Sequence, residues 1–188
     1  MKKRWKAIPF ALSLALMAGG AAELTAQPAA AAANFNPTQI NNLTPSTIIP
    51  LVVKAKAVYD YTSRGGKGTW EKFTYKGTEY RYLSRELGTR SQLLHFVKQS
   101  YTHNAAVYYA QMQFLEHDGR MAQVNVNLDG TLDYAKATAR MVSKNAETAV
   151  YELSVPHLNA PTEIDVVVVK LKKVSGYWRV DMSPAVLF

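Results

Sequence analysis

The chain has 188 residues, 48% of them hydrophobic, and it carries 22 Lys and Arg against 14 Asp and Glu, a net charge of +8. It contains no cysteine, which excludes disulfides, thiol nucleophiles and a lipid-modified N-terminal cysteine. The length and composition predict one globular domain stabilised by its hydrophobic core alone.

Residues 1–33 have the pattern of an export signal. Four basic residues near the N-terminus precede an apolar run over residues 7–22, and small residues follow over 29–33. The run is too short for a membrane span, so we expect cleavage after Ala31 or Ala33 and no membrane contact afterwards. The expected product is secreted or held at the cell wall. Without the four basic residues and one acidic residue of the signal, its net charge is +5, which either favours anionic cell-wall polymers or reflects a solvated basic surface.

Residues 34–44 are rich in Asn, Thr and Pro and are interpreted as a leader to a single domain over residues 45–188. Thr44 or Ser46 is suited to cap a first helix, with Pro50 in its first turn or at a break. The glycine-rich residues 63–68 end that helix. Because this loop follows a helix and precedes a strand, the reverse of a phosphate-binding loop, it does not indicate nucleotide binding.

A hairpin and a second helix are predicted next. The dipeptide Lys76-Gly77 separates two short strand-like runs and is typical of a tight turn. Thr89 is expected to cap a helix with one buried face. Its apolar residues recur at three- and four-residue spacings: Leu93, Leu94, Phe96, Val97 and Tyr101.

The remaining sequence predicts a short helix over residues 105–109 and then strands. Residues 111–117 and 120–124 flank the turn dipeptide Asp118-Gly119, which indicates a second hairpin. Strand-like runs over 134–143, 148–155, 164–174 and 177–182 predict an antiparallel meander. The expected fold class is therefore α+β, with N-terminal helices packed on one face of a curved antiparallel sheet, NTF2-like or cystatin-like.

The sequence carries no motif for catalysis. The four histidines lack the spacing of a zinc pair, and neither an HExxH nor a GxSxG pattern is present. We therefore expect no enzyme activity, no metal and no cofactor. Nucleic-acid binding is not expected of an exported chain of this charge. The tyrosines are interpreted as buried framework, with glycan contact as the open alternative.

Acidic residues gather in three places, residues 147–152 and two candidate loops. Glu116 and Asp118 lie at the second hairpin, and Asp129 and Asp133 lie in the segment that follows it. Turn geometry alone explains an Asp before a Gly. The alternative is that an acidic loop on a basic domain is recognised by a basic or histidine-bearing cleft of a partner.

The order of several motifs resembles the IseA family of exported inhibitors of D,L-endopeptidase autolysins. The resemblance covers roughly residues 48–183. It rests on residues 75–84 (YKGTEYRYLS), Leu93 and Phe96, Tyr101-Thr102, residues 119–123 (GRMAQ), Val155-Pro156 and residues 176–181 (GYWRVD). This chain departs from the family pattern at residues 124–131, where a more glycine-rich stretch is expected.

The resemblance implies inhibition of NlpC-type cysteine peptidases of the cell wall. The inhibitor is expected to dock on the catalytic domain and to block the peptidoglycan cleft with an acidic loop, where a carboxylate faces the catalytic histidine. Glu116 and Asp118 are the first candidates for this loop, and Asp129 and Asp133 are the next. The alternatives are an NTF2-like domain that binds a small molecule and a noncatalytic module that binds the cell wall.

Overall fold

The computed structural model describes residues 40–68, 71–125 and 130–188. These residues belong to one compact unit, Asn36–Phe188. The predicted export signal, most of the predicted leader and Asp129 lie outside the described residues. Among the helices of the described ranges, none combines the length and the apolar character that a membrane span requires.

The first helix, α1 (Pro45–Ser63), begins with a reciprocal cap. The Thr44 side chain accepts a hydrogen bond from the backbone N–H of Thr47, and the Thr47 hydroxyl accepts one from the backbone N–H of Thr44. The expectation that Pro50 lies in the first turn or marks a break is wrong. It lies inside a continuous helix, where its missing N–H removes one backbone hydrogen bond of the ladder.

Two shorter helices follow the first hairpin. A 3-10 turn, η2 (Arg85–Leu87), leads to α2 (Arg90–Val97), which Thr89 caps as predicted. Tyr101 lies beyond the end of α2 and not within it. The next helix, α3 (His103–Gln113), is longer than the expected residues 105–109, because Thr102 caps it and apolar residues continue to Met112.

The first four strands form a small sheet with the order β1-β2-β4-β3. The hairpin of β1 (Lys72–Tyr75) and β2 (Thr78–Tyr82) is confirmed, with positive φ at both Lys76 and Gly77. The second hairpin joins β3 (Leu115–His117) to β4 (Arg120–Val124). Residues 111–113, expected in a strand, belong to α3.

The last four strands form a second antiparallel sheet in sequential order. They are β5 (Thr138–Lys144), β6 (Thr148–Pro156), β7 (Ile164–Val174) and β8 (Tyr177–Val180). The predicted meander is confirmed. Tyr134 begins a 3-10 turn, η3 (Tyr134–Lys136), in place of the predicted strand, and a short helix, α4 (Pro184–Leu187), follows β8.

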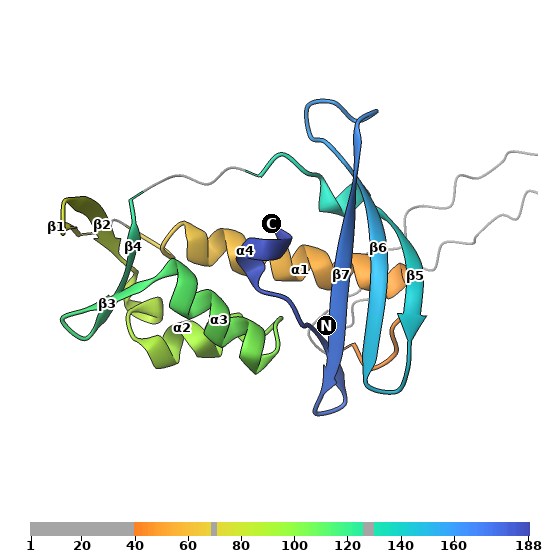
Figure 1. Cartoon of the computed structure of the whole chain (residues 1–188), viewed down its shortest axis with the longest axis horizontal. Helices are drawn as coiled ribbons and strands as arrows, with labels where there is room; N and C mark the ends of the chain where they lie inside the picture. The colour runs from red at the N-terminus through yellow and green to blue at the C-terminus, as the bar shows by residue number, and fades with distance from the viewer. Residues whose placement is uncertain (1–39, 69–70, 126–129) are drawn as a thin grey trace, which may run out of the picture. The chain divides into compact units, whose positions relative to one another are not determined.

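The α+β class is confirmed, but the single curved sheet is wrong, because the described strands form two four-stranded sheets. The NTF2-like or cystatin-like assignment is not confirmed. Helix α1 lies against the β5–β8 sheet (Figure 1), and α2 contacts α1. The helix buries Ile48, Leu51, Val52 and Ala55 in a core that also contains Tyr151 and Leu171.

The end of α1 is tied to the small sheet through one carbonyl group. The Ser63 oxygen accepts hydrogen bonds from the Arg81 guanidinium at 3.1 Å and from the Gln123 amide at 2.5 Å. Both donors lie on the face of the small sheet that turns toward α1, so the opposite face of that sheet points away from the core.

The segment before α1 is packed on the domain. Ile40 and Leu43 are buried, and the backbone N–H of Trp178 donates to the Ile40 oxygen at 2.8 Å. The Lys144 ammonium donates to the Leu43 oxygen at 2.7 Å. The packed part of the chain therefore includes residues 40–44, although their polar composition suggested a leader.

Candidate docking surface

Four aromatic side chains lie on the outward face of the small sheet. Phe73 is directly opposite Tyr80 across the first hairpin, and side chains two residues apart along a strand share a face. Tyr75 and Tyr82 therefore lie on the same face as this pair. The rings of Phe73 and Tyr82 are stacked with centroids 4.5 Å apart, and those of Phe73 and Tyr80 are 5.7 Å apart.

His117, the last residue of β3, completes this surface. Its ring is stacked on Phe73 with centroids 4.5 Å apart, and its Nδ1 is in hydrogen-bonding contact with the Tyr82 hydroxyl at 2.8 Å. Tyr75 meets the His117 ring edge-on at 5.5 Å. We call this set the aromatic face: Phe73, Tyr75, Tyr80, Tyr82 and His117.

The aromatic face is held in place from its rim. The Arg120 guanidinium lies 3.8 Å from the centroid of the Tyr82 ring and forms an ion pair with Glu71 at 2.8 Å. Tyr82 is buried beneath these neighbours, whereas Tyr75 is 36% exposed. The surface is therefore fixed in shape and still open to a partner.

Asp118 lies at the tip of the second hairpin, beside the aromatic face. It adopts a φ of 50° and Gly119 one of 70°, a pair of positive values that fits the two-residue turn predicted from Asp-Gly. The Asp118 side chain is 80% exposed, and its carboxylate lies 3.4 Å from Nδ1 of His117. Of the predicted acidic residues that the structure describes, Asp118 is the one that adjoins the aromatic face.

Glu116 is near Asp118 in sequence but lies on the other side of the sheet. It is opposite Met121, whose side chain is buried in the core, so its own side chain leaves the sheet on the face away from Tyr82. Glu116 is exposed. The hairpin thus presents two carboxylates in different directions.

Asp133 has a local structural role. Its side chain accepts a hydrogen bond from the backbone N–H of Ala135 at 3.2 Å, which caps η3, and it forms an ion pair with Lys136 at 3.2 Å. Only 16% of the side chain is exposed. Asp129 lies outside the described residues. The described structure therefore does not bring Asp133 together with Glu116 and Asp118.

The aromatic face was missed by the sequence interpretation, which treated Tyr80 and Tyr82 as framework. This is right for the buried Tyr82, but the side chains of both tyrosines lie on the outward face of the small sheet. The signal was present in the sequence. Phe73 and Tyr75 are two residues apart before the turn, and Tyr80 and Tyr82 are two residues apart after it, so each pair shares a face. A two-residue turn places Phe73 opposite Tyr80, so all four rings lie on the same face.

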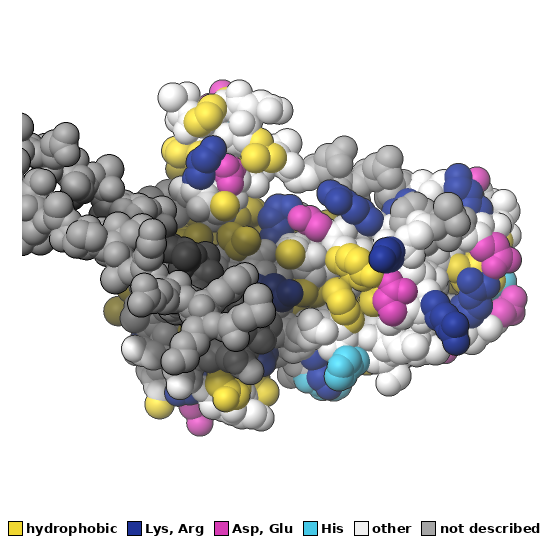
Figure 2. Space-filling view, turned by 180° about the vertical axis from the view of Figure 1, so that it is seen from behind, with side chains coloured by type: hydrophobic (Ala, Val, Ile, Leu, Met, Phe, Trp, Pro, Cys, Tyr) yellow, Lys and Arg dark blue, Asp and Glu magenta, His cyan; other side chains and the backbone are white. Residues whose placement is uncertain are grey.

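The surroundings of this surface carry both signs of charge. Lys, Arg, Asp and Glu side chains are interspersed at the end of the unit that carries β1 and β2 (right in Figure 2). No three His, Asp or Glu side chains in the described ranges are close enough to hold a metal ion. The arrangement is suited to stack on a planar group and to place one carboxylate at its edge.

Comparison with known sequences decides the family. The sequence model of the family described as "IseA DL-endopeptidase inhibitor" matches residues 39–185. The chain belongs to the IseA family. The resemblance seen in the ordered motifs is thereby confirmed, and the match extends over the helices and both sheets.

A curated relative of this IseA-family chain is the "Uncharacterized protein YoeB" of Bacillus subtilis (strain 168). The two sequences are 27% identical over 116 residues, which is 61% of this chain and 64% of the relative. The chain therefore matches less than two thirds of the length of that protein.

Proposed function

We propose that this chain is a secreted protein inhibitor of cell-wall D,L-endopeptidases and that it acts by binding the enzyme. Membership of the IseA family supports the activity, and the sequence pattern of residues 1–33 supports export. The observation that carries the binding mode is the exposed carboxylate of Asp118 beside a fixed aromatic face.

The aromatic face has the composition of a protein-binding hot spot. Tyrosine and arginine are enriched among the residues that dominate binding energy, and rings that are already stacked lose little freedom on docking. Phe73 and Tyr75 supply rigid contact area, while Arg120 is held against Tyr82 at the rim. The face can therefore bind a surface groove without rearrangement of its own.

Asp118 provides the specific contact. Its position at a hairpin tip lets it enter a cleft that the flat aromatic face cannot enter. A carboxylate that faces a protonated imidazole forms a charge-assisted hydrogen bond, which is stronger than a neutral one. In this proposal Asp118 opposes the catalytic histidine of an NlpC-type peptidase, and the aromatic face covers the adjoining substrate groove.

The test is inhibition of peptidoglycan hydrolysis by a purified D,L-endopeptidase. We expect Asp118→Ala and Tyr75→Ala each to raise the inhibition constant about tenfold to a hundredfold, as expected for the loss of about 1.5–3 kcal/mol at a hot spot. Glu116→Ala shows whether the second carboxylate of the hairpin contributes, and Asp129→Ala tests the predicted residue that the structure does not describe.

Tyr108→Ala is the matched control, because this tyrosine is 52% exposed on α3 and not part of the aromatic face. Inhibition that is unchanged by Asp118→Ala and Tyr75→Ala, with both variants folded, would disprove the docking mode. A wild-type chain that leaves hydrolysis unaltered while it sediments with purified cell wall would instead identify a wall-binding module.

A further inference from the structure

One edge of strand β7 is unpaired along half of its length in the described structure. The strand pairs with β6 over residues 164–172, from Ile164 opposite Pro156 to Lys172 opposite Thr148. On its other side, β8 pairs only with residues 171–174. The backbone N–H of Asp181 donates to the Lys170 oxygen at 2.8 Å, and the chain then turns away into α4. Along residues 164–169, no described strand lies on the side of β7 opposite β6 (Figure 1).

The backbone groups at this edge can be assigned from the strand geometry. The Lys170 oxygen points toward Asp181 and therefore away from β6. In an antiparallel ladder the direction alternates along the strand, so the N–H and C=O groups of Val168 and Val166 point the same way. Neither residue has a backbone partner on that side among the described residues.

The composition of the edge favours strand pairing. Residues 166–169 are four consecutive valines, the residue type with one of the highest preferences for strands. Val166 is 65% exposed and Val168 is 42% exposed. Proteins usually protect such an edge with lysine, proline or a covering segment, because an open hydrophobic edge pairs readily with other chains.

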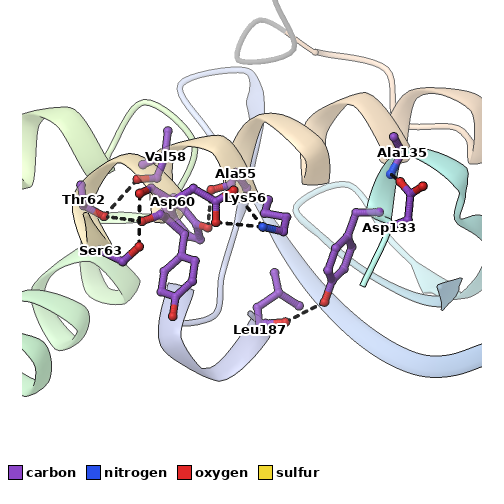
Figure 3. A network of polar contacts seen from close by, with 12 residues as sticks. Ala55, Lys56, Val58, Asp60, Thr62, Ser63, Asp133, Ala135 and Leu187 are labelled. Carbon is purple, nitrogen blue, oxygen red and sulfur yellow. Dashed lines mark hydrogen bonds and ion pairs between the residues drawn. The ribbon is translucent and has the colours of Figure 1, made fainter. Parts of the chain in front are cut away.

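This edge forms one wall of a groove of about 690 Å³. Lys56 and Tyr59 of α1 contribute its floor, residues 130–132 lie at one end, and residues 186–188 form the far wall. The far wall is fixed, since the Tyr134 hydroxyl donates to the Leu187 oxygen at 2.9 Å (Figure 3). The Tyr134 and Phe188 rings also meet edge-on with centroids 4.9 Å apart.

Lys56 is the charged side chain among the described residues that line the groove. Its ammonium contacts both carboxylate oxygens of Asp60 at 2.8 Å, and 21% of the side chain is exposed. An ammonium group has three N–H donors and can serve a second acceptor. A Cβ atom at Gly130 would lie 3.5 Å from this nitrogen, an ordinary van der Waals distance, so the backbone at residue 130 lies close to the Lys56 ammonium.

We propose that this groove binds an extended peptide segment of a partner protein. The segment adds as a strand to β7 opposite residues 164–169, takes hydrogen bonds from the backbone of Val166 and Val168, and places a carboxylate near Lys56. Backbone pairing of this kind supplies affinity, and alternate side chains supply specificity. Residues 186–188 also line the groove, so they would obstruct the sheet of a second copy at this edge.

The proposal does not depend on the proposed inhibition. The aromatic face and the groove share no residue, and they belong to different sheets. A chain with an inactive aromatic face is therefore still expected to bind the peptide, and the two proposals fail separately.

The probe is a capped peptide with the sequence of residues 150–155, Val-Tyr-Glu-Leu-Ser-Val. This sequence already forms a strand against the other edge of β7, and it carries one carboxylate. In a titration of the full-length isotope-labelled chain, we expect the backbone amide signals of Val166 and Val168 to shift on binding. The same peptide with alternate N-methyl groups cannot complete the ladder and is expected not to bind.

Two substitutions and one control define the site. Val186→Glu puts a carboxylate on the far wall at an exposed position and is expected to weaken binding about tenfold, a value typical of like-charge repulsion in a site of reduced dielectric. Val142→Glu makes the same change on β5, at a residue that is 50% exposed and outside the groove, and is expected to have no effect. Lys56→Met is expected to abolish the preference for the peptide over its Glu-to-Gln version.

Three results would overturn the proposal. The first is an absence of shifts at Val166 and Val168 at millimolar peptide. The second is equal binding of the N-methylated peptide. The third is slow hydrogen exchange of these two amides in the free chain, which would show that another part of this chain or a second copy already covers the edge.

Discussion

The Tyr61 hydroxyl donates a 2.5 Å hydrogen bond to the Glu86 carboxylate. The same carboxylate oxygen accepts the backbone N–H of Lys67 at 3.1 Å. These contacts join the last turn of α1, the glycine-rich loop and η2. The hydrogen bond from Tyr61 is the main cause that lowers the pKa of Glu86 to about 2 from its ordinary value of 4.5.

This lowered pKa predicts a dependence of stability on pH. Between pH 4.5 and about 2 the unfolded chain binds a proton at Glu86 that the folded chain does not. The contribution of Glu86 is therefore complete above pH 4.5 and is lost as the pH falls through about 2. We expect the free energy of unfolding of Glu86→Gln to fall less over this range than that of the wild type, as measured by urea unfolding. Parallel curves for the two proteins would contradict the assignment.

Gly66→Ala is expected to destabilise the chain strongly. A Cβ atom there would lie 1.8 Å from Oγ of Ser84, and φ is +82°. Gly77 is the matched control, because its φ is +80° and its Cβ position is open. We expect Gly77→Ala to cost about 1–2 kcal/mol for the backbone alone and Gly66→Ala about 1–3 kcal/mol more for the overlap. Equal losses in thermal unfolding would show that Ser84 moves aside freely.

Two buried tyrosines are expected to respond oppositely to loss of the hydroxyl. Tyr101 donates to the Ala55 oxygen at 2.8 Å, so Tyr101→Phe leaves that bond unmade and is expected to cost about 1 kcal/mol. The Tyr151 hydroxyl is buried and has no partner among the described residues. Tyr151→Phe is therefore expected to be neutral or stabilising in the same denaturant titration. A larger loss for Tyr151→Phe than for Tyr101→Phe would reverse this interpretation.

Asp133→Ala separates a structural acid from the proposed inhibitory one. It removes the cap of η3 and the contact with Lys136, and the expected cost is about 0.5–2 kcal/mol of stability. Inhibition measured below the unfolding temperature is expected to remain at the wild-type level. A loss of inhibition equal to that of Asp118→Ala would place the segment around Asp133 in the interface.

Local rules predicted much of the fold correctly. The dipeptides Lys76-Gly77 and Asp118-Gly119 form the expected turns, with the positive φ at both positions that a two-residue turn of type I′ requires. Thr44 and Thr89 cap helices for an equally local reason, since their side chains bond to backbone groups three residues away.

Features that depend on distant contacts were not predictable in this way. The division into two sheets depends on hydrogen bonds between strands far apart in sequence, such as β2 with β4. The carbonyl oxygens of Ile40 and Leu43 accept hydrogen bonds from Trp178 and Lys144, which come over 100 residues later. The separation of Asp133 from Asp118 also follows from tertiary packing, although the two residues looked alike as acids in loops.

The shared carbonyl of Ser63 has a consequence for how the chain opens. Since α1 packs on the β5–β8 sheet and its last residue holds both Arg81 and Gln123 of the small sheet, fraying at the end of this helix releases the hairpins together. We therefore expect the two hairpins to open as one cooperative unit, so that their backbone amides exchange with deuterium at a common rate limited by the last turn of α1.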